Sequence, residues 1–376
     1  MYIPQLKDKR VALYANHTAV IGGEHLLDVL IEKGINVCAV FAPEHGFRGT
    51  EDAGAHIAHS KDMKTGTPIL SLYSGKTGKP SSASMQTFDV LLIDIQDVGL
   101  RFYTYYITMY KLMEACAEYG KQVIILDRPN PNGHYVDGPI LDMKYKSGVG
   151  YLPIPIVHGM TLGELAQMIN GEKWLPRGLQ CTLTVVPCLN YTHQTRYSLP
   201  IAPSPNLPNM KSIYLYPSLC LFEGTVVSLG RGTDFPFQVF GHPAMKGYTY
   251  SFVPRSIAGA KNPPLLNQHC YGRDLSLLSD DEIAENGFDL TYLIEAYRAL
   301  NIGDRFFTPF FEKLVGVGYI RTMIKAGKSA SEIKDRWHTD VKRFKEQRKP
   351  YLLYEYDAEE TPYFKPGTRI QCPCIS

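Results

Sequence analysis

The pair Glu44-His45 lies in the string PEHGFRG, residues 43–49, directly after an apolar run. A carboxyl group held in a partly desolvated loop has a raised pKa and donates a proton as a general acid. The proline and glycines around the pair fix an unusual backbone path. We therefore expect Glu44 and His45 to be catalytic. In the alternative, Glu44 is a solvated acid or is paired with Arg48.

Two carboxylates, Asp94 and Asp97, stand at the end of a second apolar run, FDVLLIDI. Paired carboxylates bind Mg²⁺ or act as the acid and base of a hydrolase. Asp94 and Asp97 are therefore further catalytic candidates. In the alternative, Asp97 caps the next loop and Asp94 pairs with Arg101 or Arg128.

Arg101, Tyr103 and Tyr105 alternate along the chain, which in an extended segment places all three on one face. One guanidinium beside two phenols is a suitable receptor for an anionic, hydroxylated ligand. The alternative is a core tyrosine pair beside a solvated arginine. Arg231 lies between two glycines, which let a ligand approach the backbone closely beside the guanidinium. Such a turn is also suited to binding an anion.

His158 and the pair Asp127-Arg128 follow further strand candidates. A histidine in that position binds a ligand or transfers a proton, or it is a structural histidine with satisfied hydrogen bonds. We interpret Asp127-Arg128 as an internal ion pair that orients its loop.

The elements that must position these side chains alternate between strand and helix. Near-continuous apolar runs separated by amphipathic segments predict a parallel sheet covered on both faces, and ligands of such sheets lie outside the carboxyl ends of the strands. The fold class is therefore α/β with a Rossmann-like domain. No G-x-G-x-x-G follows the first strand, so we expect no dinucleotide. The predicted strands are residues 10–15, 36–41, 88–95, 122–127 and 154–157, and the predicted helices are 24–33, 104–119 and one opened by a Thr161/Glu164 capping box.

From about residue 245 the pattern changes to mixed α+β. It predicts a helix over residues 289–300 and another that starts at Ser329, with Ile333, Trp337, Val341 and Phe344 on one face. We place a Rossmann-like domain at residues 1–240 and a smaller α+β C-terminal domain at 241–376.

Composition excludes several classes of protein. The net charge is +2 and 44% of the residues are hydrophobic, which excludes a basic nucleic-acid binder, a disordered chain and a coiled coil. No run of 18 apolar residues occurs, so we expect no transmembrane segment. The N-terminal string MYIPQLKDKR lacks the apolar region of a signal peptide. No oligomeric state is predicted.

Seven strings in order, FAPEHGFRG, TGTPILSLYSG, DVLLIDIQDVGLRFYTY, VIILDRPNPNG, VHGMTLGELA, APSPNLPN and LFEGTVVSLGRGTDFPF, carry a resemblance from about residue 10 to the C-terminus. The sequence resembles the bacterial exo-β-N-acetylmuramidases of the NamZ type, glycoside hydrolase family 171. The resemblance implies a Rossmann-like catalytic domain joined to a smaller auxiliary domain, with the active site in the cleft between them. It implies release of terminal N-acetylmuramic acid from the non-reducing ends of peptidoglycan fragments, in cell-wall recycling. It also implies that Glu44 is the acid/base, and that the protein is periplasmic or secreted if a signal peptide has been removed, and otherwise cytoplasmic.

The lactyl carboxylate of N-acetylmuramic acid requires a cation, and Arg48, Arg101 and Arg231 are the candidates, with Arg101 ranked first. The second catalytic group is Asp94, Asp97 or the substrate's own 2-acetamido group. We expect no cofactor and no metal. The competing hypotheses are a non-catalytic cell-wall-sugar binding protein and a metal-dependent phosphoryl or ester hydrolase that uses Asp94 and Asp97. The residues expected to bind substrate are Asn16, Arg48, Arg101, Tyr103, Tyr105, Arg128, His158, Asn206, Glu223 and Arg231.

Overall fold

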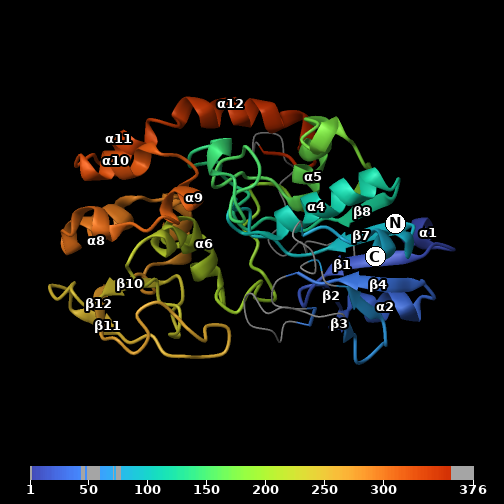
Figure 1. Ribbon diagram of the computed structural model, residues 1–376, viewed down its shortest axis with the longest axis horizontal. Helices are drawn as coiled ribbons and strands as arrows, with labels where there is room; N and C mark the ends of the chain where they lie inside the picture. Colours follow the sequence, from blue (N-terminus) through green and yellow to red (C-terminus); the bar gives the residue numbers. More distant parts are fainter. Residues whose placement is uncertain (1, 44–46, 49–59, 71, 73–77, 357–376) are drawn as a thin grey trace.

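The computed structural model describes residues 2–43, 47–48, 60–70, 72 and 78–356. Its larger sheet has the strand order β5-β6-β4-β1-β7-β8-β9 (Figure 1). All neighbouring strands are parallel except β5, which is antiparallel to β6. The strands are β1 Val11–Ala15, β4 Val37–Phe41, β5 Ser60–Lys61, β6 Pro68–Leu70, β7 Val90–Asp94, β8 Gln122–Leu126 and β9 Thr182–Val186. The predicted α/β Rossmann-like fold is confirmed.

Both faces of this sheet are covered, which explains its near-continuous apolar strands. In β1, Val11 and Leu13 pack into the hydrophobic cluster that includes α2, whereas Ala12 and Tyr14 pack into the cluster that includes α4 and α5. The helices of this part are α1 Ile3–Leu6, α2 Leu26–Glu32, α3 Ser82–Gln86, α4 Tyr105–Glu118 and α5 Leu162–Gly171, with 3-10 turns η1 Met143–Tyr145 and η2 Pro176–Gly178 and a hairpin of β2 Val20–Ile21 and β3 Glu24–His25.

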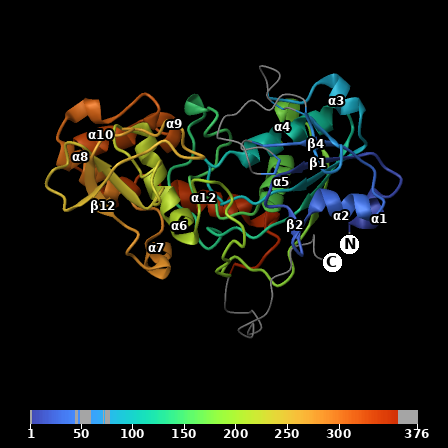
Figure 2. The same ribbon diagram turned by 90° about the horizontal axis from the view of Figure 1, so that it is seen from below.

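The second part of the chain is α+β, as predicted, and lies beside the sheet domain (Figure 2). Its antiparallel sheet has the order β10-β12-β11. Its elements are α6 Met210–Leu219, η3 Cys220–Gly224, β10 Val239–His242, β11 Tyr250–Phe252, β12 Cys270–Asp274, α7 Asp280–Asn286, α8 Thr291–Leu300, η4 Gly303–Phe306, α9 Phe311–Val315, α10 Tyr319–Lys325, α11 Ala330–Lys334, α12 His338–Arg348 and η5 Lys349–Tyr351. The predicted capping boxes at Thr161 and Ser329 are both present.

The chain returns to the sheet domain at its C-terminal side, where α12 crosses back and η5 packs on α5 (Figure 1). Arg348 Nη1 donates to the carbonyl oxygens of His158 and Gly159. Tyr354 Oη donates to Asp127 Oδ2 at 2.7 Å, and the Leu353 amide donates to Glu164 Oε1 at 2.8 Å. The C-terminal segment therefore supplies hydrogen-bond donors to two buried carboxylates.

Two sequence predictions differ from the structure. Residues 154–157 do not form a strand of the sheet. Val157 forms only isolated antiparallel bridges with Leu100 and Asp137, which belong to neighbouring loops. The helix expected from Ser329 is divided into α11 and α12, although its four apolar residues are all buried as predicted. The domain boundary at residue 240 stays a prediction.

Candidate functional site

The carboxyl ends of the parallel strands bring several predicted site residues to one edge of the sheet. The chain runs from β1 to β4 on one side and then to β7 on the other, so the strand order reverses between β1 and β7. Ligands of doubly wound sheets bind outside this reversal point. Asn16 follows β1, and Asp94 is the last residue of β7. Glu44 and His45 follow β4 in sequence but lie outside the described residues, so their roles stay predictions.

A cavity of about 190 Å³ lies between the loop that follows β7 and the second part of the chain. Five of the residues predicted from the sequence line it together, although they come from three distant stretches of sequence. An aromatic wall beside a few polar groups is the ordinary composition of a small-molecule site. The lining residues are Phe102, Tyr103, Thr104, Tyr105, Val149, Ser204, Asn206, Leu207, Tyr216, Glu223, Arg231 and Phe237.

Tyr103 and Tyr105 form one wall of this cavity. Their rings meet edge to face at a centroid distance of 4.8 Å, and both hydroxyls donate to the Pro203 carbonyl oxygen, at 3.0 and 3.3 Å. Asn16 Nδ2 donates to the Tyr105 hydroxyl at 3.2 Å. Asn16 therefore supports the wall from behind. Burial raises the pKa of Tyr103 well above its ordinary value, so its hydroxyl stays protonated.

Asn206 also lines the cavity. Its Nδ2 donates to the Gly259 carbonyl oxygen at 2.9 Å, which joins the loop before α6 to the loop after β11. This bond fixes the side chain and leaves its Oδ1 as the acceptor that a ligand can use.

Arg231 and Glu223 are the charged residues among those that line the cavity. Arg231 Nε and Nη2 both donate to Glu223 Oε1, at 2.9 and 2.6 Å. The guanidinium also lies over the Phe237 ring, 5.0 Å from its centroid. Gly230 and Gly232 have φ of +85° and +81°, and a Cβ on either would approach a backbone oxygen to 2.5 Å. The turn that presents Arg231 therefore requires both glycines.

Arg101 does not share a face with Tyr103 and Tyr105, contrary to the sequence prediction. The chain turns at residues 101–104 and α4 begins at Tyr105, so the segment is not extended. The buried guanidinium donates through Nη1 to Pro139 and Ile154 and through Nη2 to Leu314 and Val315, all at carbonyl oxygens 2.6–3.0 Å away. Burial lowers the pKa of Arg101 to about 10. Arg101 thus joins the two parts of the chain instead of lining the cavity.

Arg48 is also occupied by protein groups. Its Nε and Nη2 donate to the two carboxylate oxygens of Asp62, at 2.6 and 2.8 Å, and Nη2 also reaches Asp28 at 3.2 Å. The hydrogen bonds from Arg48 lower the pKa of Asp62 to about 2, more than burial raises it. A ligand carboxylate would have to displace this bidentate pair.

Asp94 forms a buried ion pair with Arg128, in which Arg128 Nε donates to Oδ1 and Nη2 donates to Oδ2 at 3.0 Å. This is one of the alternatives that the sequence left open. The predicted Asp127-Arg128 pair is wrong, since Asp127 accepts from Thr161 Oγ1 and the Gly163 amide at the start of α5. Neither Asp94 nor Arg128 lines the cavity described above.

Asp97 accepts from the Gly99 amide through Oδ1 at 2.6 Å, which is the loop cap considered from the sequence. Its Oδ2 is buried and has no partner among the described residues. Burial raises the pKa of Asp97 to about 7, and the backbone hydrogen bonds only partly oppose it.

His158 has the environment of a structural histidine. Its Nδ1 accepts from the Met160 amide at 3.2 Å, and the ring is 1% exposed. Burial, with Arg348 nearby, lowers the pKa of His158 to about 3, so the ring is neutral. His158 does not line the cavity.

Three aromatic lining residues were missed by the sequence reasoning: Phe102, Tyr216 and Phe237. Tyr216 packs edge to face on both Phe237 and Tyr103, so it connects Phe237 with the wall formed by Tyr103 and Tyr105. The count of 25 tyrosines was a general signal for such a cleft, but it does not identify which tyrosine is used.

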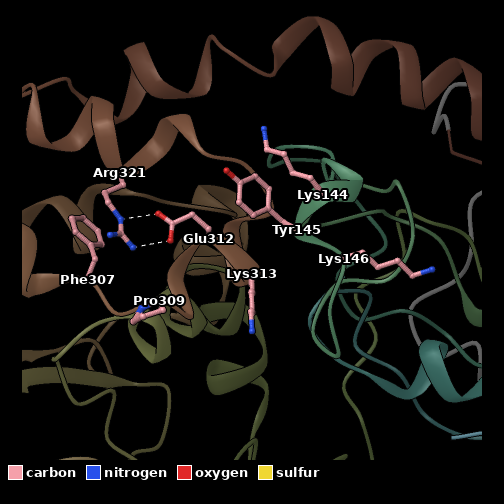
Figure 3. A pocket seen from close by; sticks show the side chains of 8 residues that line it. All are labelled: Lys144, Tyr145, Lys146, Phe307, Pro309, Glu312, Lys313 and Arg321. Carbon is pink, nitrogen blue, oxygen red and sulfur yellow. Dashed lines mark hydrogen bonds and ion pairs between the residues drawn. The ribbon is translucent and has the colours of Figure 1, made fainter. Parts of the chain in front are cut away.

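A second cavity, of about 490 Å³, lies between the loop containing η1 and residues 307–321 (Figure 3). Arg321 is held by Glu312, with Nη2 donating to Oε2 at 2.7 Å. Figure 3 shows Lys146 pointing away from this pair. None of the predicted site residues lines this cavity, so we place the candidate site in the first one.

Within the described ranges, no group of three or more His, Cys, Asp or Glu side chains is placed to hold a metal ion. In the same part of the chain, none of the helices has the length and apolar character needed to cross a membrane.

Comparison with known proteins gives matches over nearly the whole chain. Residues 11–211 match the N-terminal part, and residues 214–354 the C-terminal part, of the family described as exo-β-N-acetylmuramidase NamZ. The chain is 38% identical over 378 aligned residues to the peptidoglycan β-N-acetylmuramidase NamZ of Bacillus subtilis (strain 168). The alignment covers 94% of this chain and 89% of that protein.

Two crystal structures of DUF1343 family proteins from Bacteroides fragilis NCTC 9343 have the same fold. One is 67% identical with a TM-score of 0.90 and covers 95% of this chain and 97% of its own. The other is 30% identical with a TM-score of 0.78 and covers 94% and 96%.

Proposed function

The chain belongs to the NamZ family of exo-β-N-acetylmuramidases, and from this premise we propose that it is a glycoside hydrolase acting on peptidoglycan fragments. Its substrate is a saccharide with N-acetylmuramic acid at the non-reducing end, which it releases as the free sugar. This activity serves the turnover and recycling of cell-wall material.

The observation that carries the proposal is the cavity lined by Arg231, Glu223 and five aromatic rings at the boundary of the two matched regions. N-acetylmuramic acid differs from N-acetylglucosamine by a lactyl ether, so its receptor needs a cation. Of the three arginines considered, Arg101 is bonded to four carbonyls and Arg48 to two carboxylates. Arg231 is the one that lines the cavity. We assign the lactyl carboxylate to Arg231, because a guanidinium donates to carboxylates with strong, charge-assisted hydrogen bonds.

The aromatic rings supply the apolar part of the receptor. Tyr103, Tyr105 and Tyr216 present ring surface to the cavity, on which the less polar face of a sugar packs. The fixed Asn206 provides an amide oxygen for a sugar hydroxyl. Since Tyr103, Tyr105 and Asn206 are held by hydrogen bonds to backbone carbonyls, little ordering of these side chains accompanies binding.

For the chemistry we assign the acid/base to Glu44, which follows β4 in the sequence and lies outside the described residues. A protonated carboxyl group there donates to the departing glycosidic oxygen and afterwards activates water. Neither Asp94 nor Asp97 lines the cavity, and Asp94 is occupied by Arg128. This arrangement favours the substrate's own 2-acetamido oxygen as the nucleophile over either aspartate.

The test is incubation with matched chromogenic glycosides of N-acetylmuramic acid and N-acetylglucosamine. We expect release of the chromophore from the first and much slower release from the second. Binding of N-acetylmuramic acid without turnover of either glycoside would show a binding protein and contradict the proposal. Turnover that is lost in EDTA and restored by Mg²⁺ would point to a metal-dependent hydrolase instead.

A further inference from the structure

Glu223 and Arg231 give the cavity a donor and an acceptor side by side. Both Arg231 bonds end on the same oxygen, Glu223 Oε1. Within the described part of the chain, this leaves Oε2 of Glu223 and Nη1 of Arg231 without a protein partner. The side chains are 26% and 27% exposed and both line the cavity, so these two atoms are accessible to a ligand there.

The backbone holds the pair in place from both sides. Gly224 follows Glu223, and a Cβ on it would lie 2.5 Å from the Phe311 Cα, so η3 is pressed against α9. Arg231 is held by its two-glycine turn and by the Phe237 ring. A receptor whose members are fixed before binding selects for ligand geometry, because little entropy is lost when the ligand docks.

N-acetylmuramic acid carries complementary groups on neighbouring ring carbons. Its 2-acetamido N–H is a donor, and the lactyl ether on the next carbon ends in a carboxylate acceptor. A single ion pair that offers one acceptor and one donor can therefore engage both substituents at once. A sugar that lacks either group leaves Glu223 or Arg231 without a hydrogen-bond partner from the ligand.

We propose, on the basis of the function proposed above, that Glu223 is a specificity-determining residue for the 2-acetamido group. Glu223 Oε2 accepts the acetamido N–H while Arg231 Nη1 donates to the lactyl carboxylate. The hydrogen bond from the N–H raises the electron density on the acetamido oxygen, which is the atom that attacks in the substrate-assisted route. Glu223 does not contact the scissile bond in this assignment; it positions the group that reacts.

The assignment has a signature that a merely structural role for Glu223 lacks. Glu223→Met keeps the length of the side chain and removes its acceptors and its charge. It should cost about 10- to 100-fold in the affinity for N-acetylmuramic acid, the range of a hydrogen bond to a charged group. For a 3-O-lactyl-2-deoxyglucose ligand, which has no donor at C2, the affinity should stay the same or rise, since Arg231 is released from its partner.

The experiment is calorimetric titration of the full chain with N-acetylmuramic acid and with 3-O-lactyl-2-deoxyglucose. Glu223→Gln is the second variant. It retains an oxygen acceptor, so it should show the same pattern with a smaller loss. Glu312→Met is the matched control, because it breaks an arginine ion pair of the same kind in the second cavity (Figure 3) and should change neither affinity.

Equal losses for the two ligands in both Glu223 variants would overturn the assignment, since they would mean that Glu223 only orients Arg231. If the variants give equal losses but the wild-type protein hydrolyses the N-acetylmuramic acid glycoside, the proposed function stands and only the role of Glu223 is overturned. Wild-type protein that neither binds nor hydrolyses it would overturn both.

Discussion

Replacement of Arg101 by methionine should destabilise the whole protein, although sequence reasoning ranked this residue first as a ligand contact. The substitution removes four donor bonds to the carbonyls of Pro139, Ile154, Leu314 and Val315. A buried polar group that loses its partner costs about 1–3 kcal/mol. Removing a buried charge also returns part of its desolvation cost, so we take the low end. Four carbonyls at about 1 kcal/mol each give a loss of roughly 4 kcal/mol.

The loss can be converted into a melting temperature. An unfolding entropy of about 2.1 cal/mol/K per residue amounts to roughly 0.8 kcal/mol/K for 376 residues that melt together. Arg101→Met should therefore lower Tm by about 5 °C in scanning calorimetry. Arg101→Lys should give a smaller decrease, because a lysine has three donors for the four carbonyls.

The control is Arg343→Met, which removes an exposed ion pair with Asp340 on α12. Such pairs contribute about 0–1 kcal/mol, so the shift should be no more than about 1 °C. An Arg101→Met protein that melts within about 1 °C of wild type would refute the reasoning, because the four carbonyls would then be satisfied without the guanidinium.

Four further outcomes are expected. Glu44→Gln should keep the fold and reduce kcat about 10²–10⁴-fold on a substrate with a poor leaving group, and activity within threefold of wild type would exclude Glu44 as the acid. Activity should be unchanged in EDTA; a loss of activity that Mg²⁺ restores would instead support a metal-dependent hydrolase that uses Asp97. Arg231→Ala should narrow the kcat/KM ratio between N-acetylmuramic acid and N-acetylglucosamine glycosides more than Arg48→Ala does, and Arg231→Lys should weaken the muramic substrate to a lesser degree; an unchanged ratio would place the lactyl contact elsewhere. The pKa of Asp97 is raised to about 7, so the folded protein retains a proton that the unfolded chain loses near pH 4, and stability falls as pH rises from about 4 to 7; Asp97→Asn should flatten that decline in melts across this range, and an unaltered slope would contradict it.

The sheet was predictable because its physical cause is local. β1, β4, β7 and β8 are short apolar runs bounded by helix signals, and burial on both faces leaves such runs few alternatives. Strand β6, which lies next to the edge strand β5, and the edge strand β9 were not predicted. Pro68 begins β6, and threonines alternate through the first half of β9.

The site was predictable at the level of loops but not of bonds. Tyr103, Tyr105, Asn206, Glu223 and Arg231 do meet in one cavity. The strand-end rule accounts for Tyr103 and Tyr105, which follow β7, whereas the other three residues come from the second part of the chain. Whether each arginine is free to bind a ligand depends on hydrogen-bond partners, and those of Arg101 include residues far away in the sequence. Arg101 bonds carbonyls more than 200 residues later, which no local spacing encodes.

The return of the C-terminal segment to Asp127 and Glu164 has a consequence for the order of folding during synthesis. The sheet strands and α5 emerge from the ribosome well before Leu353 and Tyr354, which lie 189 and 227 residues after the carboxylates they serve. Until that segment is released, each carboxylate lacks one of its buried donors. The nascent sheet domain then contains two buried carboxylates with incomplete hydrogen bonding. Chains that stop short of residue 353 should therefore be retained by chaperones or degraded by proteases.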